Sequence, residues 1–453
     1  MKTARTVMLI AILALAIVGC DDRSMNPGSG DFALGASDIG TGPTNPSGEG
    51  CGDLPTQPDS VRVDLYTPSF SDPLDADNPL FPVGELDRVL LLGTVDGEPL
   101  RVETTRLPGT RRILVNDQEV ETIISQYVAW VDGRIEEVAI DWYGQDDTGA
   151  VFYFGEDVFN YEDGFVANID GTWLAGREGP VAMIMPADPQ IGNAWRPENA
   201  CPLVFEEVTA TDTDVTVQGP RGPVAGALIV QELHMDGTFE DKTFAPGYGE
   251  FSTGSGSNLE AVAVAVPTDA LPGPVPDEVE TLSDGAERIF ELAKTGRWRD
   301  TAAVAEEMND AWDEFQATGV PPRLDAQMSD ALEALYAAIS ARDKEETRQA
   351  SVNVALASVD FELRHEEREE IDRDLIEIWS RQLIIDMRAH DRGAVLGDLA
   401  TIQVIRDRLT ESARSIDGEL STLRAAAHAG DFAEATECAT RLRDTLARLN
   451  GRS

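Results

Sequence analysis

IEEVAIDWYGQDDTGAVFYF, residues 135–154, is the segment that most clearly predicts the architecture of the first half of this chain. Two runs rich in β-branched and aromatic residues, 135–143 and 151–154, flank the polar segment 146–149. Such runs favour strands, and a short segment of Asp, Thr and Gly between them favours a tight turn. The segment therefore predicts a β-hairpin.

The same pattern extends to both sides of this hairpin. Further strand-like runs cover residues 89–95 and 226–233, and Asp-Gly pairs separate such runs at 96–97, 132–133, 163–164 and 236–237. Asp-Gly suits two-residue hairpin turns, because both residues tolerate positive φ. With no helical pattern between the runs, residues 59–266 are expected to form an antiparallel β domain, one twisted sheet curled into a half-barrel or a sandwich.

Several short motifs in this region follow one another in an order and at spacings that make chance agreement a poor explanation. The region resembles an uncharacterised group of bacterial exported proteins and lipoproteins with no known activity. The resemblance implies a fold and a location in the cell envelope, but no chemistry. The motifs are NPLFP (78–82), DWYGQD (141–146), YFGED (153–157), WLAG (173–176), IMPADP (184–189) and APGYGE (245–250).

The second half of the chain has a helical period. Residues 267–278 form a Pro-rich linker, expected to be an extended spacer, and residues 279–450 are expected to form an all-α bundle of about eight helices. Asp343 with Glu346, and Asp431 with Glu434, match the pattern that begins a helix. Together with the first half, this predicts an α+β multidomain protein.

The helical half also resembles itself. Residues 293–315 parallel 388–409, and residues 336–359 parallel 424–446, which predicts an internal duplication of a four-helix unit. The corner at 429–435 resembles that of tetratricopeptide hairpins, although any short corner between two helices converges on a similar sequence. A generic helical bundle is the preferred interpretation.

The N-terminus predicts the protein's location. Lys2 and Arg5 precede an apolar run over residues 7–18, which is shorter than the roughly 20 residues of a membrane span. Ile-Val-Gly before Cys20 resembles a bacterial lipobox, and this implies a signal peptide over 1–19 and an acylated Cys20. An ordinary secretory signal with a chance cysteine is the alternative. Residues 20–58 are rich in Gly, Ser and Pro and are expected to be a flexible tether.

The composition limits the partners. The chain has 453 residues and a formal net charge of −46. Such a surface repels phosphate backbones, so nucleic acid is excluded as a partner, and it repels anionic lipid, so the membrane contact is expected to be the acyl anchor. The expected location is therefore the cell envelope, lipid-anchored to a bacterial membrane and facing the periplasm or the exterior.

The remaining three cysteines have separate expected roles. Cys51 and Cys201 are expected to form a disulfide in an oxidising compartment. Cys438 lies on the apolar face of a late helix and is expected to be a small buried side chain.

Two candidate sites lie in the β domain. Oxygen ligands near the 142–154 hairpin suit calcium, with an acidic hairpin tip as the alternative; they are Asp141, Asp146, Asp147, Glu156 and Asp157. Aromatic side chains could line a concave sheet face and hold an apolar or sugar ligand, with plain core packing as the alternative; they are Trp130, Trp142, Phe152, Phe154, Trp173 and Trp195.

Familiar catalytic motifs are missing from the sequence. His365-Glu366-Glu367 begins like a zinc-protease motif, but Glu369 stands where the second histidine is needed. We therefore expect no catalytic residue and no cofactor, with calcium as the one candidate ion. The expected function is a lipoprotein with a non-catalytic β domain that binds a ligand or an envelope partner, and a helical scaffold. The alternatives are an envelope hydrolase that uses carboxylates of the β domain, and a calcium- or metal-binding envelope protein.

Overall fold

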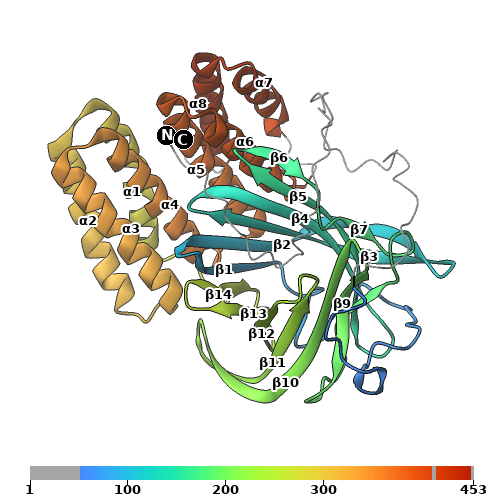
Figure 1. Ribbon diagram of the computed structural model, residues 1–453. Helices are drawn as coiled ribbons and strands as arrows, with labels where there is room; N and C mark the ends of the chain where they lie inside the picture. The colour runs from blue at the N-terminus through green and yellow to red at the C-terminus, as the bar shows by residue number, and fades with distance from the viewer. Residues whose placement is uncertain (1–50, 411–414, 450–453) are drawn as a thin grey trace.

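The computed structural model of the chain describes residues 51–410 and 415–449. The predicted signal peptide, the lipidation site Cys20 and the tether up to residue 50 lie outside the described residues. The described part begins with a short 3-10 helix, Asp59–Val61, and continues with strands followed by helices (Figure 1). The predicted α+β class, with an antiparallel β domain followed by a helical domain, is confirmed.

Fourteen strands form one antiparallel sheet in the order β6-β5-β4-β3-β2-β1-β14-β13-β12-β11-β10-β9, and β7 and β8 both pair with β5. The strands are β1 (Arg88–Val95), β2 (Glu98–Val115), β3 (Gln118–Val131), β4 (Arg134–Gln145), β5 (Val151–Glu162), β6 (Phe165–Asn168), β7 (Trp173–Leu174), β8 (Ala182–Met185), β9 (Ala194–Ala200), β10 (Val204–Gly219), β11 (Gly222–His234), β12 (Phe239–Ala245), β13 (Gly249–Ser255) and β14 (Asn258–Val266).

The predicted Asp-Gly turns connect neighbouring strands. In three of them both residues have positive φ, as a two-residue hairpin turn requires: Asp96-Gly97, Asp132-Gly133 and Asp163-Gly164. At the fourth, only Gly237 has positive φ. The turn at 146–149 is closed by the Asp146 carboxylate, which accepts hydrogen bonds from the backbone N–H groups of Thr148 and Ala150. Local sequence therefore specifies these connections.

The sheet is open but strongly curled. Strands β9–β13 curve beneath β2–β5 (Figure 1), and β8, paired with β5, lies beside β9 at the other end of the strand order. A single hydrophobic cluster joins both ends, with Trp142 of β4, Phe152 of β5, Trp195 of β9 and Val230 of β11. The predicted half-barrel describes this shape, and the curl creates an enclosed concave face.

Eight helices follow among the described residues: α1 (Asp277–Thr295), α2 (Trp298–Gln316), α3 (Pro322–Ala341), α4 (Lys344–Glu362), α5 (Arg368–Ala389), α6 (Arg392–Arg406), α7 (Asp417–His428) and α8 (Phe432–Leu449). Their sequence signals act as predicted. The Asp343 side chain accepts hydrogen bonds from the N–H groups of Glu345 and Glu346, and Asp431 accepts from that of Glu434. Cys438 is buried.

The helices form two similar units. Helix α1 packs on α2 and α4, and α3 packs on α4; in the same way α5 packs on α6 and α8, and α7 packs on α8. The two groups are separate in Figure 1, with α1–α4 beside the sheet and α5–α8 above β4–β6. This repeated packing agrees with the predicted duplication.

The sheet and the helices share one hydrophobic core. Trp130 of β3 stacks on Trp379 of α5, with the ring centroids 6.1 Å apart, and its indole N–H donates to Thr401 of α6. Leu90 and Val264 belong to the same continuous cluster as the helix interiors. The convex face of the sheet is therefore covered by helices.

Buried ion pairs cross this interface. Arg88 pairs with Asp372, and Arg408 lies 2.5 Å from Glu103 through its Nη1 atom. Arg101 of β2 lies 2.7 Å from Asp360 of α4. These pairs fix the orientation of the helices on the sheet.

The Pro-rich segment, expected to be an extended spacer, is packed into the molecule. Val275 is buried in the core shared by sheet and helices. The Leu271 N–H donates to the Arg364 carbonyl, and the Asp269 carboxylate accepts from Tyr248 and from the Ala265 N–H. The segment is packed between the two halves because their common core draws it in, and α1 begins at Asp277, two residues before the predicted boundary.

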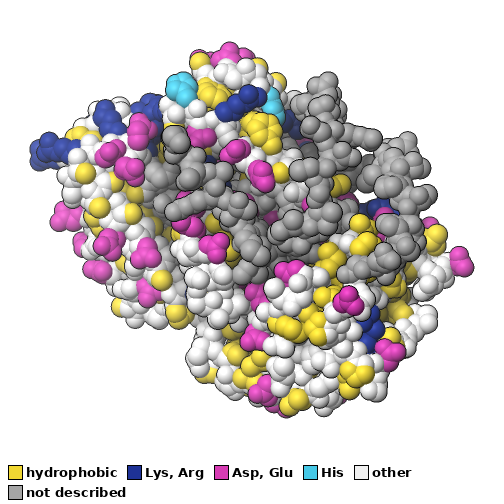
Figure 2. Space-filling view, viewed as in Figure 1, with side chains coloured by type: hydrophobic (Ala, Val, Ile, Leu, Met, Phe, Trp, Pro, Cys, Tyr) yellow, Lys and Arg dark blue, Asp and Glu magenta, His cyan; other side chains and the backbone are white. Residues whose placement is uncertain are grey.

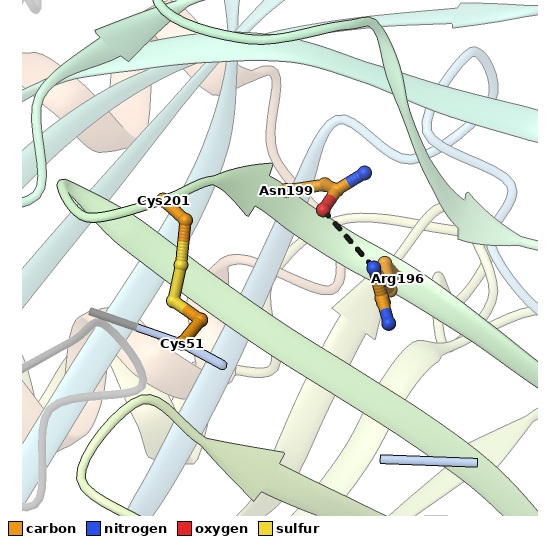
Figure 3. Close-up of a disulfide and its surroundings, with 4 residues drawn as sticks. All are labelled: Cys51, Arg196, Asn199 and Cys201. Carbon is orange, nitrogen blue, oxygen red and sulfur yellow. Dashed lines mark hydrogen bonds between the residues drawn. A yellow bond between two sulfur atoms is a disulfide. The ribbon is translucent and has the colours of Figure 1, made fainter. Parts of the chain in front are cut away.

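The predicted disulfide is present. Cys51 and Cys201 are bonded, with their Cα atoms 6.3 Å apart (Figure 3). The bond joins the first described residue to the segment between β9 and β10, close to Arg196 and Asn199 (Figure 3). Among the described helices, none is both long enough and apolar enough to cross a bilayer.

Candidate functional site

The concave face of the curled sheet encloses a cavity of about 150 Å³. Every strand except β6 and β7 contributes at least one lining residue, and the loop segment 81–86 closes one side. The rings of Phe81, Tyr143, Tyr153, Phe244 and Tyr248 form much of the wall. The cavity is therefore a product of the whole sheet.

Acidic side chains line the same cavity in unusual number. Six carboxyl groups face it, against the two cationic side chains Arg106 and Lys242; the acids are Asp141, Glu198, Glu206, Glu232, Glu250 and Glu260. Carboxylates are rarely buried unless they are paired. Their concentration inside a β domain makes this cavity the strongest candidate site.

Strand register brings these acids together. Glu206 of β10 lies opposite Glu198 of β9 and opposite His234 of β11, so the three form one row across the sheet. In the next row, Glu232 of β11 lies opposite Glu240 of β12. Side chains at directly opposed positions of an antiparallel pair are neighbours on the same face.

Two cations of the chain balance part of this charge. Lys242 Nζ lies 2.5 Å from Glu232, and His234 Nδ1 lies 3.4 Å from Glu206. Burial would lower the pKa of His234, but its contacts with the Glu206 and Glu240 carboxylates raise it to about 10. Burial also raises the pKa of Glu232, and with the nearby Glu206 charge it reaches about 8 despite Lys242.

The guanidinium group of Arg106 does not pair with the carboxyl groups of the cavity. Its Nη2 atom donates to Asp87, 2.7 Å away, and its Nη1 atom donates to the Gly84 carbonyl. It therefore closes the rim of the cavity rather than neutralising the acids inside.

Glu156 and Glu198 form a buried carboxyl pair where the two ends of the sheet meet. They are 0 % and 1 % exposed, and no N–H or hydroxyl group of the described residues donates to their oxygens. Burial raises the pKa of both groups well above the usual range, and neighbouring carboxylates raise it further. The two groups therefore retain protons that ordinary glutamates lose.

Asp141 stands beside this pair, opposite Glu156 in the strand register. Tyr153 donates a hydrogen bond to Asp141 Oδ1 at 2.7 Å. Burial raises the pKa of Asp141 to about 7, although this hydrogen bond lowers it. A carboxyl group with such a pKa exchanges its proton near neutral pH.

Two groups of described side chains could hold a metal ion. Within each group the candidate ligand atoms lie within 4.8 Å of one another; the groups are Glu206, Glu232 and His234, and Glu362, Glu366 and Asp374. In the first group, a metal ion would have to displace the Lys242 ammonium from Glu232 and separate His234 from Glu206. We therefore describe the first group as an ion-pair network.

The structure does not bring the five predicted calcium ligands into one cluster. Asp141 and Glu156 are on the concave face, whereas Asp157 lies 3.7 Å from Arg111. Asp146 and Asp147 lie in the hairpin turn, where Asp147 accepts hydrogen bonds from Ser69 and Ser71. The five separate because adjacent strand residues face opposite sides and the turn acids serve the turn. Calcium binding by the protein remains a prediction.

The predicted aromatic face is not the wall of the cavity either. Trp130 is at the interface with the helices, and Trp142, Phe152, Phe154, Trp173 and Trp195 are buried in one hydrophobic cluster; none of the six lines the cavity. Core packing, the alternative interpretation, describes them. Trp142, Phe152 and Phe154 stay out of the cavity because each is the immediate strand neighbour of a lining residue, Asp141 or Tyr153, and adjacent strand residues face opposite sides of the sheet.

Sequence reasoning missed Glu198, Glu206, Glu232, His234 and Glu260, which come from strands after residue 193. A signal was present. In V-F-E-E-V, residues 204–208, and in V-Q-E-L-H, residues 230–234, charged residues occupy the same alternate positions as buried apolar ones. Inward-facing charges in a strand are costly unless they serve a pairing or a ligand.

On the face shown in Figure 2, acidic side chains are scattered over helices and sheet alike. Comparison with protein-family models, curated proteins and solved structures found no match for this chain. The function must therefore be argued from the chemistry of the cavity.

Proposed function

We propose that the β domain is a non-catalytic binding module that holds a small ligand in the cavity of its curled sheet. The observation that carries this proposal is the convergence of side chains from twelve strands on one space of about 150 Å³. An apolar cavity of that size can hold a benzene-sized molecule. Aromatic walls with a few polar groups are typical of small-molecule sites.

The helices are proposed to act as the scaffold of this module. They cover the convex face, share its core and join it through buried ion pairs such as Arg101–Asp360. A sheet supported in this way holds its curvature, and therefore the shape of its cavity. If the protein has a protein partner, we propose that it is an envelope protein that binds to the helices.

The protein is further proposed to be a lipoprotein of the bacterial cell envelope, anchored through Cys20. The basic, apolar and Cys-terminated pattern of residues 1–20 supports this, and so does the Cys51–Cys201 disulfide, since disulfides persist in oxidising compartments. Labelled palmitate should enter the wild-type protein and not the Cys20→Ser variant. A Cys20→Ser variant that still sediments with membranes would exclude the anchor.

The cavity proposal is tested by native mass spectrometry of the exported chain from residue 21 onward. We expect a retained small molecule on the wild type. Val208 lines the cavity and Thr211 is exposed on the same strand. The Val208→Trp variant, which fills the cavity, should lose the molecule, and the Thr211→Trp control should keep it. Equal retention by both variants would place the molecule elsewhere.

A hydrolase is the second candidate function. Asp141 and Glu198 line one cavity, and the pKa of Asp141 near 7 suits a general acid. Hydrolysis of glycoside or ester substrates that is abolished by both Asp141→Asn and Glu198→Gln, in variants that remain folded, would favour this candidate. Activity that survives both substitutions would exclude it.

A further inference from the structure

The buried carboxylates of the cavity define what kind of ligand would fit it. We propose that the ligand is a small primary amine, bound as its ammonium ion with its N–H groups directed at Glu198 and Asp141 and its carbon chain against the aromatic wall. This inference rests on the proposed binding function of the cavity and adds the chemical class of the ligand.

The first argument is charge. Of the cations near the cavity, Lys242 is held by Glu232, His234 by Glu206 and Arg106 by Asp87. No such cation of the described residues is paired with Asp141 or Glu198. A ligand that carries positive charge would therefore supply what these acids lack.

The second argument is hydrogen bonding, and it is independent of charge. Both oxygens of Glu198 are buried, and no N–H or hydroxyl group of the described residues donates to them; the neighbouring Glu156 carboxyl group is the hydrogen-bond partner of Glu198. One carboxyl partner leaves most of the acceptor sites of Glu198 unfilled, and unfilled buried acceptors are costly, so a ligand with N–H groups is favoured over one without them. A primary ammonium has three N–H donors, whereas a quaternary ammonium has none.

The third argument is the shape and character of the wall. Tyr143 and Tyr153 stack with their ring centroids 4.8 Å apart, and Phe81 packs edge-on against Tyr143. Aromatic faces attract cations as well as alkyl chains. The volume limits the ligand to about the size of benzene, which corresponds to an amine of four to six carbon atoms.

The alternative is that the acids are neutralised by protons alone. The groups that face one another here are Asp141, Glu156, Glu198, Glu206, Glu232, His234, Glu240, Lys242, Glu250 and Glu260. Burial raises the pKa of Glu198 and brings that of Asp141 to about 7, so protons and an ammonium ion compete for both groups. Amine affinity should therefore increase as pH rises through about 7, where Asp141 ionises.

The experiment is calorimetric titration of the chain from residue 21 onward, which contains every described residue. The probes are n-butylamine, n-butanol, butyrate and tetramethylammonium, which separate charge from hydrogen bonding at similar size. We expect butylamine to bind more tightly than each of the other three by at least tenfold. The Glu198→Gln variant should lose about tenfold or more in butylamine affinity, because it removes a charged acceptor. The Glu119→Gln control, at an exposed position, should not.

The outcomes separate the two proposals. Butanol or butyrate binding as tightly as butylamine, with loss of binding in Val208→Trp, would overturn the ammonium inference and leave the binding function standing. Tetramethylammonium binding equally well would overturn the role of the N–H donors. Displacement of butylamine by Ca²⁺ or Zn²⁺ at lower concentration would assign the acids to a metal. If no probe binds and native mass spectrometry finds no retained molecule, the binding function itself fails.

Discussion

Single residues at the junction of sheet and helices carry charges that water does not reach. Arg88 and Asp372 are 2 % and 0 % exposed. A buried pair of this kind is a weak source of net stability, because desolvation opposes the Coulomb attraction. Breaking it is costly, since the remaining charge stays buried. Such pairs therefore specify one arrangement of the two halves.

Replacing Arg88 with Met should destabilise the protein by about 3–5 kcal/mol, because the buried Asp372 loses its hydrogen-bonded cation and keeps only Arg408, 3.6 Å away. Chemical denaturation of the chain from residue 21 onward measures the free energy of unfolding. The control is Arg288→Met, which breaks the exposed pair with Glu307, and it should cost no more than about 1 kcal/mol. Equal effects of the two substitutions would contradict the role assigned to the buried pair.

A second prediction for a single residue concerns Glu137 and the pH dependence of the protein's stability. Its side chain is buried on β4, and its Oε1 atom has no hydrogen-bond partner among the described residues. Burial, with the nearby Asp141 charge, raises its pKa from 4.5 to about 7. Between these two pH values the native state keeps a proton that the unfolded state has lost. The contribution to the free energy of unfolding therefore falls as pH rises through this window, by up to about 3 kcal/mol.

The Glu137→Gln variant should remove this pH dependence. We expect it to unfold at a higher temperature than the wild type at pH 8 and at a similar temperature at pH 4.5. Thermal unfolding followed by circular dichroism across this range measures the difference. Glu119→Gln, at an exposed position, should follow the wild-type curve. A Glu137→Gln curve parallel to that of the wild type would show that Glu137 titrates normally.

Between elements, the contact of a hairpin turn with a helix is especially close. Gly164, at the tip of the β5–β6 hairpin, lies against the backbone of Gly393 and Gly397 in α6. A Cβ atom at residue 164 would be only 2.5 Å from the Gly397 nitrogen. Three glycines from two elements thus allow the sheet edge to touch the helix.

Gly164→Ala should therefore destabilise the protein by more than the cost of placing an alanine at positive φ, because the new methyl group also clashes with α6. Gly97 is the matched control, since it also ends an Asp-Gly turn with positive φ but has open space where a Cβ atom would lie. We expect Gly97→Ala to cost about 1 kcal/mol and Gly164→Ala to cost at least about 2 kcal/mol more, as overpacking does. Urea denaturation measures both. Equal losses would show that the hairpin moves away from α6 without cost.

For the molecule as a whole, the disulfide is a covalent constraint of long range. Cys51 and Cys201 are 150 positions apart in sequence. The double variant Cys51→Ser, Cys201→Ser should lose about 2–4 kcal/mol, since the bond restricts the unfolded chain. A reducing agent should lower the melting temperature of the wild type and leave that of the variant unchanged. A wild type insensitive to reduction would show that the bond adds no stability.

The shared core makes a further prediction for the whole molecule. Helices expressed alone, as residues 277–449, would lose the sheet residues Leu90, Trp130 and Val264 from their core, and Asp372 would lose Arg88. We expect this fragment to unfold without a cooperative transition and to bind a hydrophobic dye. Calorimetry beside the chain from residue 21 onward makes the comparison. A sharp transition in the fragment would show that the helices are an independent domain.

The sequence by itself determined the features that depend only on residues close together in the chain, namely the tight turns and the starts of helices. Asp163-Gly164 specifies its turn because both residues tolerate positive φ, and Asp343 begins α4 because its side chain reaches the free N–H groups of the first turn. The strand and helix periods predicted the two halves of the chain and their boundary at Val266. The sequence parallels within the helical half predicted an internal duplication, and the two four-helix units pack in the same way.

Only the tertiary structure decided which of these residues meet. Glu156 and Glu198 belong to strands at opposite ends of the sheet order, and the curl brings their carboxyl groups together. The predicted calcium ligands and the predicted aromatic face did not identify the cavity, because a cavity lined by twelve strands depends on the curvature of the whole sheet. Alternation along a strand predicts which side chains share a face of the sheet. Long-range packing against the helices determines how strongly the sheet curls, and therefore how far it surrounds the cavity.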